Sequence, residues 1–354
     1  MKKNKSILGI AILAFTMIIT SCATTVTVSY MKPAKFNLSD YKNLAVATTE
    51  VKNAPIFTSS RIYIDYDNHR DSIRSGYDRL IPNEIADYYT SNVYSSLQKS
   101  GLFNLISPAK TDLMIKNLKY GISDSSKLYD MGADAIFTSE IEYLDYDEYP
   151  VYGDYIVIKN PDYDDDSSQS QYIQSDKRRV TIWQEAQMKI SYSIIDLKDG
   201  TILASNSYTQ TVKNSEDLNF YTTSLSAEWM FEDIADTFIE KTKTDLFPHT
   251  VYTSLELMDN KPKNSLANEA MKLVKNNQLL QAETLFEQAW NEDKHLPSGY
   301  NAALLIEAMG DRTNAMYLMK EIYNETGSVD AMTAYSRMKS FDTSSSAAAQ
   351  QIED

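Results

Sequence analysis

One stretch of regular alternation, residues 180–197, constrains the fold more than any other part of this chain. In "VTIWQEAQMKISYSIIDL" apolar side chains occupy every second position, interrupted only by Gln184. A period of two places these side chains on one face of a long β-strand. The stretch runs into Asp199-Gly200, a dipeptide that favours a tight hairpin turn, and "TILASNSYTQTV" follows. The sequence therefore predicts a long antiparallel hairpin with one buried face.

Two amphipathic helices are predicted to pack on that face. Residues 82–100 begin with Pro82 and end before Gly101, a usual place for a glycine that terminates a helix. A second helix is predicted over residues 226–243. Their apolar side chains recur at helical spacing and are Ile85, Tyr89, Val93, Leu97, Ala227, Met230, Phe231, Ile234 and Phe238. Residues 22–258 therefore predict an α+β domain, in which helices pack on a mixed, largely antiparallel sheet.

The order of four motifs in this domain resembles a known family. "NLAVAT", "LQKSGLFNLIS", "GADAIFTSEI" and "IIDLKDGTIL" follow one another as they do in CsgG-like lipoproteins, which include the curli secretion lipoprotein and penicillin-binding-protein activators. The resemblance covers about 200 residues. It implies a periplasmic α/β domain in the cell envelope.

Two segments, near 52–76 and 145–178, interrupt the predicted sheet. They lie near the places where the curli secretion lipoprotein carries membrane-crossing hairpins. A membrane-crossing strand needs about nine to eleven residues with every second one apolar, and here acids, Arg70 and Pro150 intervene within a few residues. We therefore interpret both segments as tyrosine-rich loops rather than parts of a pore.

Residues 262–340 predict a second domain that is entirely helical. Its apolar positions recur after 33 residues, and the matched positions are Ala270, Leu273, Ala282, Phe286 and Ala289 with Ala303, Ile306, Ala315, Met319 and Ile322. Helical pairs with small alanines at this period resemble tetratricopeptide repeats, which implies a helical groove for a partner protein. Gly299 departs from that family, because a large side chain is expected there. Residues 341–354 are predicted to be a disordered tail.

The N-terminus predicts a lipid anchor. Lysines precede the apolar run "ILGIAILAFTMIIT", a pattern typical of a secretory signal peptide over residues 1–21 and short for a membrane span. "ITSC" ends at Cys22, the single cysteine, and resembles the bacterial lipobox. The resemblance implies a diacylglycerol on the Cys22 sulfur and an N-acyl group such as palmitate. Ala23 and Thr24 lack an aspartate that would signal inner-membrane retention, so we expect an outer-membrane protein facing the periplasm. The alternative is a buried free cysteine.

Charge excludes one class of partner. Removing the three lysines of the leader leaves 31 lysines and arginines against 49 acids, a formal net charge of −18. Nucleic acids bind to basic faces, so we expect no nucleic-acid partner. The chain contains His69, His249 and His295, and no two of them have metal-ligand spacing. Phosphate loops, nucleophile elbows and zinc-protease motifs are absent from the sequence. We therefore expect no enzymatic activity and no cofactor besides the lipid.

Two loop features remain as candidate binding residues. Asp162, Asp164 and Asp166 alternate like the first ligands of an EF-hand, but Ser167 replaces its glycine and Ile173 its final glutamate, so a hydrophilic loop without a metal is the preferred interpretation. Five tyrosines recur at every third position and form a candidate interaction surface, or pack on their own sheet: Tyr143, Tyr146, Tyr149, Tyr152 and Tyr155.

The features together predict a lipid-anchored periplasmic protein that acts as a non-enzymatic interaction or assembly factor of the cell envelope. Its partners would bind to the helical repeats and the tyrosine-rich loops. The second hypothesis is a CsgG-like oligomer that assists secretion across the outer membrane. A third, an envelope hydrolase, has no set of residues in its favour. The identity of the partner and the oligomeric state stay open.

Overall fold

The computed structural model describes residues 24–52, 58–65, 72–119, 132–160, 171–218 and 227–353. The chain divides into two compact units. The α/β unit is Ala34–Phe247, and the helical unit joins the N-terminal segment up to Pro33 to Pro248–Glu353. The predicted boundary near residue 260 therefore shifts, because the strand before it belongs to the helical unit. None of the described helices combines the length and apolar character needed to cross a membrane.

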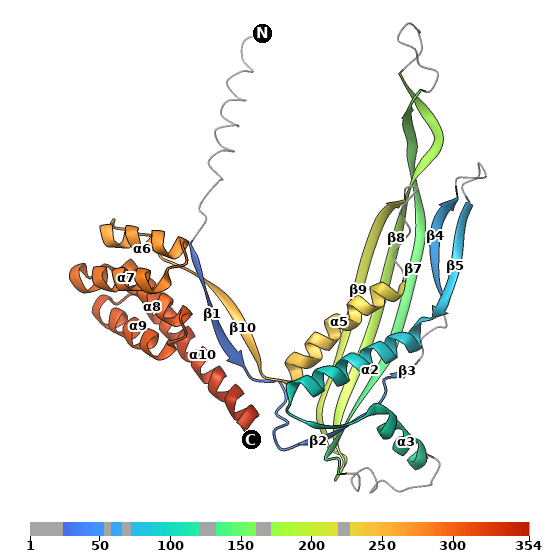
Figure 1. Cartoon of the computed structure of the whole chain (residues 1–354), viewed down its shortest axis with the longest axis horizontal. Coiled ribbons are helices and arrows are strands. Elements are labelled where there is room, and N and C mark those ends of the chain that lie inside the picture. The colour runs from blue at the N-terminus through green and yellow to red at the C-terminus, as the bar shows by residue number, and fades with distance from the viewer. Residues whose placement is uncertain are drawn as a thin grey trace. The chain divides into compact units, whose positions relative to one another are not determined.

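The α/β unit is built on one mixed sheet with the order β6-β2-β7-β8-β9 (Figure 1). The strands are β2 (Asn43–Val46), β6 (Asn104–Ile106), β7 (Ala135–Lys159), β8 (Tyr172–Asp196) and β9 (Ile202–Leu218), and β3 (Glu50–Val51) also pairs with β7. β2 lies parallel to β6 and β7, whereas β7, β8 and β9 are antiparallel. The predicted hairpin is confirmed, and its turn places Gly200 at φ +80°, a conformation that favours glycine.

Helices α2 (Ile81–Ser100) and α5 (Ala227–Leu246) lie side by side across one face of this sheet (Figure 1). Every apolar residue predicted for the two helices is buried, as are the alternating residues of β8. The interruption at Gln184 is buried as well, and its amide donates to the Tyr146 hydroxyl at 2.7 Å. The predicted α+β class and its main core are therefore confirmed for the described residues.

Helix α3 (Pro108–Lys119) packs on the other face of the sheet, near one end. Successive residues of β2 separate the two faces, because Leu44 and Val46 join the main core while Ala45 and Ala47 pack with Ile115 of α3. Beyond α3, no described helix covers this second face of β7, β8 and β9. We call it the open face.

The prediction of loops at 52–76 and 145–178 is wrong for the described residues. β7 and β8 each continue for 25 residues as an antiparallel pair, and β4 (Thr58–Asp65) pairs with β5 (Ser72–Leu80) in a separate hairpin. Two of the acidic residues that suggested a loop along β7, Asp145 and Asp147, alternate onto the open face, where they are exposed to water. A β-bulge between Ile141 and Tyr143 shifts this alternation by one residue.

The helical unit contains five consecutive helices and one two-stranded ribbon among its described residues. The helices are α6 (Ser265–Lys275), α7 (Leu279–Asp293), α8 (Leu296–Ala308), α9 (Arg312–Thr326) and α10 (Val329–Glu353). The predicted repeat positions are buried or pack against the core. The ribbon pairs β1 (Thr25–Lys32) with β10 (His249–Glu256), so "TVTVSY" is a strand but lies outside the α/β unit.

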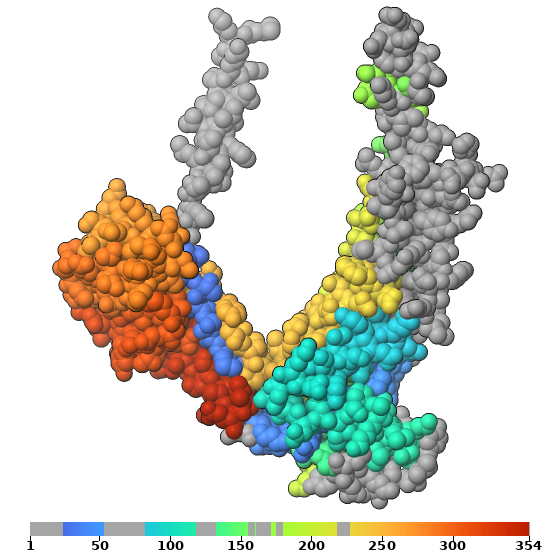
Figure 2. Space-filling view, viewed as in Figure 1, coloured from blue at the N-terminus to red at the C-terminus, as the bar shows by residue number. Residues whose placement is uncertain are grey.

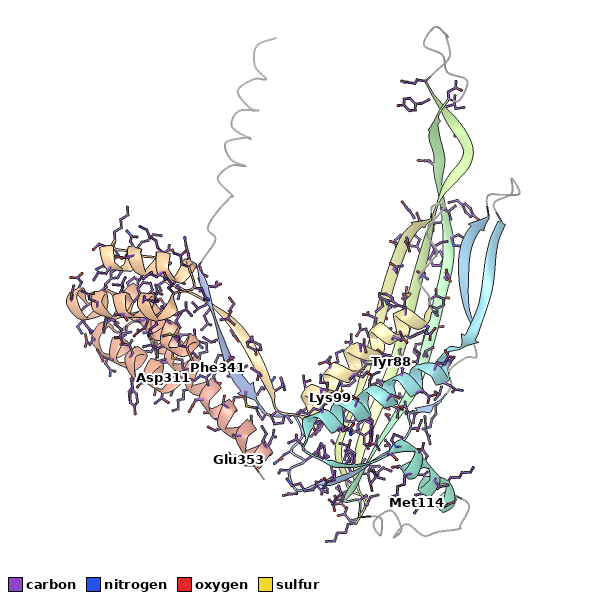
Figure 3. The ribbon with its side chains drawn as sticks, in the orientation of Figure 1. Tyr88, Lys99, Met114, Asp311, Phe341 and Glu353 are labelled. Carbon is purple, nitrogen blue, oxygen red and sulfur yellow. The ribbon has the colours of Figure 1, made fainter. Side chains whose placement is uncertain are left out.

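The predicted disordered tail is wrong up to residue 353, because α10 continues to Glu353. Contacts with β1 hold this part of the helix. The ring of Phe341 stacks on Tyr30 with 3.9 Å between centroids, and the Met31 amide donates to Ser345 at 3.2 Å. Phe341 is labelled in Figure 3, and Figure 2 shows the blue atoms of β1 against the helices. A polar composition thus adopts a helix because a strand distant in sequence packs against it.

Gly299 departs from the repeat pattern for a reason that the structure supplies. A Cβ at this position would lie 2.8 Å from Cδ2 of Trp290 and 3.0 Å from Cδ1 of Ile322. Trp290, on the preceding helix α7, is fully buried and fills the space that a large side chain at 299 would use. The expected large residue is therefore supplied by a neighbouring helix.

We predict that Gly299→Ala destabilises the helical unit by up to about 2 kcal/mol. Overpacking against Trp290 costs about 1 to 3 kcal/mol, and the gain in helix propensity offsets about 1 kcal/mol of this cost. Thermal unfolding followed by circular dichroism measures the change. The second substitution Trp290→Phe removes part of the indole and should restore some of the loss, whereas an unchanged Tm for Gly299→Ala alone would contradict the packing.

Candidate functional site

The open face of the α/β unit carries two of the sequence-predicted candidate tyrosines, Tyr143 and Tyr149. On β9 its side chains are Ser205, Ser207, Thr209, Thr211, Lys213, Ser215 and Asp217, and all of them are exposed. On β8 the open face carries Thr181, Trp183, Glu185, Gln187, Lys189, Ser191 and Ser193, between the buried residues of the main core. A sheet with one solvated face shows this alternation of polar and apolar residues.

The predicted tyrosines lie on strand β7 and not on a loop, and they divide between the two faces. Tyr143 and Tyr149 are exposed on the open face. Tyr146 points to the helix-covered face, where burial raises the pKa of its hydroxyl and its ring packs near Phe231. Tyr152 lies opposite Val180 of the same covered face yet is exposed, and Tyr155 is in β7 opposite Arg178. A spacing of three cannot keep all five rings on one side of a strand.

Apolar neighbours complete a cluster on the open face. Trp183 of β8 lies directly opposite Tyr149, and Val151 follows two residues along β7. The exposed fractions are 53% for Tyr149, 43% for Val151 and 42% for Trp183. We call Tyr149, Val151 and Trp183 the aromatic patch. The sequence analysis did not select Trp183 or Val151. The sequence does contain a signal for Trp183. In the alternation of residues 180–197 this large aromatic residue occupies a position on the polar face, which indicates an exposed ring.

Ion pairs cross the strands of the open face. Lys189 lies 2.5 Å from Glu142, and this contact, together with Ser191, lowers the pKa of the Glu142 carboxyl. Lys213 lies 2.8 Å from Glu185, and Lys52 pairs with Glu140. All six side chains are partly or largely exposed, so water screens each pair and it adds little to stability. Their main effect is to fix side-chain positions on the face.

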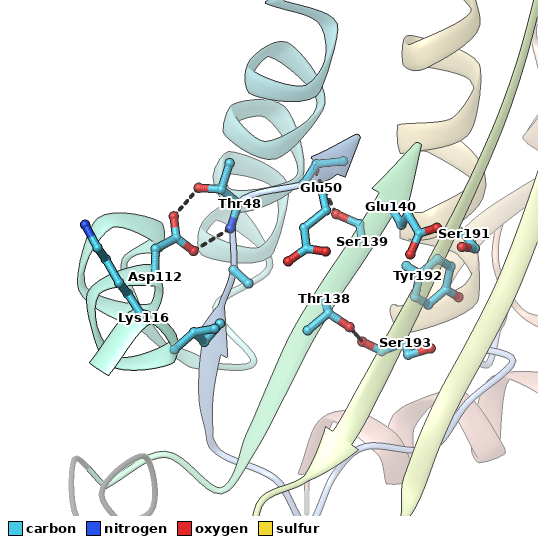
Figure 4. Close-up of a pocket in the computed structure, with 13 residues that line it drawn as sticks. Thr48, Glu50, Asp112, Lys116, Thr138, Ser139, Glu140, Ser191, Tyr192 and Ser193 are labelled. Carbon is cyan, nitrogen blue, oxygen red and sulfur yellow. Dashed lines mark hydrogen bonds between the residues drawn. The ribbon is translucent and has the colours of Figure 1, made fainter. Parts of the chain in front are cut away.

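The end of the open face nearest α3 is hollowed into a polar cleft of about 700 Å³ (Figure 4). Its wall on β2 and α3 is held by Asp112, which accepts from the Thr48 amide at 3.0 Å and from the Thr48 hydroxyl at 2.5 Å. Below it, the Thr49 hydroxyl lies 2.7 Å from that of Thr90 and 2.8 Å from that of Ser139. This buried chain of hydroxyls links the segment between β2 and β3 to α2 and β7.

The polar cleft is lined by groups that form hydrogen bonds. The residues that line the cleft carry hydroxyls, carboxylates and one lysine, Lys116, but no histidine or cysteine. The Asp112 carboxylate is engaged by Thr48. The arrangement can hold a polar group by hydrogen bonds.

The groove that the repeats predicted is filled at α8 by the chain itself. The resemblance to tetratricopeptide repeats implies that the first helix of each pair, here α6, α8 and α10, lines the inner side of the stack. The ribbon of β1 and β10 packs on α8 and α10, and Asn301 of α8 exchanges two hydrogen bonds with the backbone of Met258, at 2.7 and 2.9 Å. Nine of the 13 residues of α8 are buried. The ribbon therefore occupies the place at α8 where a partner would bind.

The remaining predicted residues have separate positions. Cys22, His69, Asp162, Asp164 and Asp166 lie outside the described residues. His249 is in β10, and His295 is buried just before α8, with its ring nitrogens 2.6 Å from the Ser298 hydroxyl and 2.7 Å from the Pro262 carbonyl. No group of three histidines, cysteines or acids suited to a metal occurs within the described ranges. His295 therefore serves packing.

Comparisons with known proteins give similar structures at low identity. No protein-family model matches the sequence, and no curated protein matches it. The PelC dodecamer from Paraburkholderia phytofirmans is 10% identical, with a TM-score of 0.25 over 62% of this chain and 96% of that chain. The lipoprotein GNA1162 from Neisseria meningitidis is 10% identical, with a TM-score of 0.26 over 57% and 97%. The LpoB C-terminal domain from Salmonella enterica is 12% identical, with a TM-score of 0.22 over 56% and 92%.

Proposed function

We propose that this chain is a lipid-anchored envelope protein that binds a partner protein through the open face, without catalysing a reaction. The observation that supports it is the aromatic patch, which exposes large apolar side chains on a sheet face that no described helix covers. Exposed apolar and aromatic side chains of this kind are typical of protein-binding surfaces. Because the ribbon of β1 and β10 covers α8, we place the binding site for the partner on the open face and not on the helical repeats.

The N-terminal sequence supports the anchored location. A basic start, a short apolar run and the lipobox-like "ITSC" precede Cys22. Two residues separate Cys22 from β1, which begins at Thr25, so the chain between the lipidated sulfur and the folded helical unit would span about 10 Å at most. A diacylglycerol with an added acyl chain would hold the protein at the membrane, because two or more chains give stable anchoring.

The second candidate, a CsgG-like oligomer that assists secretion, is favoured by one observation. The segments 52–76 and 145–178 contain paired strands instead of loops. In the described part of the chain, β9 pairs only with β8, and β4 pairs only with β5. Strands with an available edge can pair with a second copy. A self-associated form would therefore use these edges.

One experiment tests both candidates in intact cells. A photo-crosslinking residue replaces Trp183 in the aromatic patch, and separately Tyr317, a position on α9 that is more exposed, at 71% against 42%. We expect position 183 to yield one heterologous protein adduct that position 317 does not yield. The Cys22→Ser variant should lose that adduct and leave the membrane fraction.

The outcomes separate the candidates. Adducts at multiples of the chain mass from position 183 would favour the oligomer. The same adduct pattern from positions 183 and 317 would contradict an interface on the open face. Cys22→Ser protein that stays in the membrane fraction would contradict the lipid anchor.

A further inference from the structure

We propose that the aromatic patch receives an extended polypeptide segment that carries arginine or lysine side chains at alternate positions. This inference rests on the proposed function and specifies the chemistry of the partner. It depends on three features of the open face: its negative charge, its aromatic rings and the distance between successive side chains along β7.

The first feature is an excess of negative charge beside the aromatic patch. Asp145 and Asp147 precede Tyr149 on the same face of β7, and Asp147 lies directly opposite Glu185 of β8. Like charges in directly opposed positions of a sheet destabilise it. Lys189 pairs with Glu142 and Lys213 with Glu185, so these two lysines leave the charges of Asp145 and Asp147 uncompensated. A cation from a partner placed over Asp147 would supply this counter-charge.

The second feature is the pair of rings next to these carboxylates. Tyr149 and Trp183 face each other one step along the strands from Asp147 and Glu185, and both side chains are about half exposed. Aromatic faces attract guanidinium and ammonium groups, and tryptophan does so most strongly. Carboxylates and rings therefore offer a cation two favourable contacts at one place.

The third feature is the spacing, which fits a polypeptide. Asp145, Asp147, Tyr149 and Val151 occupy every second position of β7 on one face. Such positions repeat at about 6.6 to 6.8 Å, and every second side chain of an extended polypeptide repeats at the same distance. A segment that lies along β7 can thus place successive cations over the acids and an apolar residue over Val151.

The test uses the mature chain purified in detergent and three synthetic dodecapeptides. One alternates arginine with threonine, one alternates glutamate with threonine, and one has the arginines grouped at one end. We expect binding in the order alternating arginine, grouped arginine, glutamate, measured by calorimetry at physiological salt. Trp183→Thr with Tyr149→Thr should weaken binding of the alternating peptide about tenfold, and Asp147→Asn with Glu185→Gln should do the same.

Two control variants separate a specific site from general attraction to an acidic protein. Glu269→Gln with Glu292→Gln removes the same charge from exposed positions of α6 and α7, and Tyr252→Thr removes an exposed tyrosine from β10. These variants should bind like the unmodified chain. Equal weakening by the control and patch variants, or equal binding of the two arginine peptides, would overturn the inference.

Failure of the inference can be told from failure of the proposed function. If the crosslink from position 183 captures a partner while the peptides bind without regard to the aromatic patch, the open face is an interface for a different chemistry. If position 183 also yields no specific adduct, both proposals fail.

Discussion

Replacing Glu307 with alanine is expected to lower the free energy of unfolding of the helical unit by about 3 to 5 kcal/mol. The side chain of Glu307 has no exposed surface, and its carboxylate accepts from both terminal nitrogens of Arg337, at 2.9 and 2.6 Å. Nε of Arg312 lies 3.5 Å from the same carboxylate. Alanine would leave two largely buried guanidinium groups without their counter-charge, and this loss is larger than the value of the ion pair itself.

The contacts of the two arginines explain why the effect should reach the ribbon. Arg312 also donates to the Ser29 carbonyl of β1 at 2.5 Å. Both guanidinium groups lie over the ring of Phe341, which stacks on Tyr30. Glu307 therefore orients a cluster that joins α8, α9 and α10 to β1. We expect Glu307→Ala to loosen β1 together with the helices.

The positions of the three tryptophans allow the unfolding of the helical unit to be followed separately from that of the α/β unit. Trp183 and Trp229 belong to the α/β unit, so Trp183→Phe with Trp229→Phe leaves buried Trp290 as the reporter of the helical unit. Urea unfolding followed by its fluorescence gives the free energy. Glu325→Ala is the matched control, because Glu325 pairs with Lys294 on the surface and should cost about 0 to 1 kcal/mol. An equal small loss in both variants would contradict the role of burial.

The second large effect is expected at Asp245 in the α/β unit, where alanine should cost about 3 to 5 kcal/mol. Its Oδ2 atom accepts from the Tyr192 hydroxyl at 2.7 Å, the Tyr208 hydroxyl at 2.5 Å and the Asn206 amide at 2.6 Å. Each donor that is left buried without an acceptor costs about 1 to 3 kcal/mol. Asp236→Ala is the control, because Asp236 accepts from Tyr88 at an exposed site and should cost much less.

The same site should give stability a dependence on pH. Burial opposes ionisation of Asp245, but hydrogen bonds from Asn206, Tyr208 and Tyr192 outweigh it and lower the pKa of this carboxyl. A carboxyl with a lowered folded-state pKa stabilises the fold fully above its unfolded value of about 3.9. This stabilisation is lost as the pH falls through the folded-state pKa.

We therefore expect the unmodified chain to exceed Asp245→Asn in stability at pH 7 and at pH 5. The difference should shrink below about pH 4, as Asp245 becomes protonated. Urea unfolding of Trp290→Phe protein, read from Trp183 and Trp229, measures the α/β unit. A difference that stayed constant down to pH 2.5 would show that the charge of Asp245 contributes nothing.

Candidate site residues were harder to predict than the core. The tyrosines at every third position suggested one surface, but a strand has a period of two, and the bulge after Ile141 sets which of them reach the open face. Asp147 and Glu185 are far apart in sequence and meet only through the register of β7 and β8. Trp183 becomes a candidate binding residue because Tyr149 lies directly opposite it on the neighbouring strand. The sequence pattern of a single strand does not show which residues of its neighbour will lie opposite it.

The long hairpin, the two helices over its buried face and the 33-residue helical pairs could all be predicted from the amino-acid sequence. These follow from the periodicity of consecutive side chains, which decides locally whether a segment can bury one face as a strand or a helix. Three features became visible in the folded chain alone: Thr25–Lys32 pairs with residues 249–256, this ribbon packs on α8, and residues 341–353 are helical. Those outcomes depend on burial and pairing between segments more than 200 positions apart. The periodicity of one segment does not show which distant segment will pack against it.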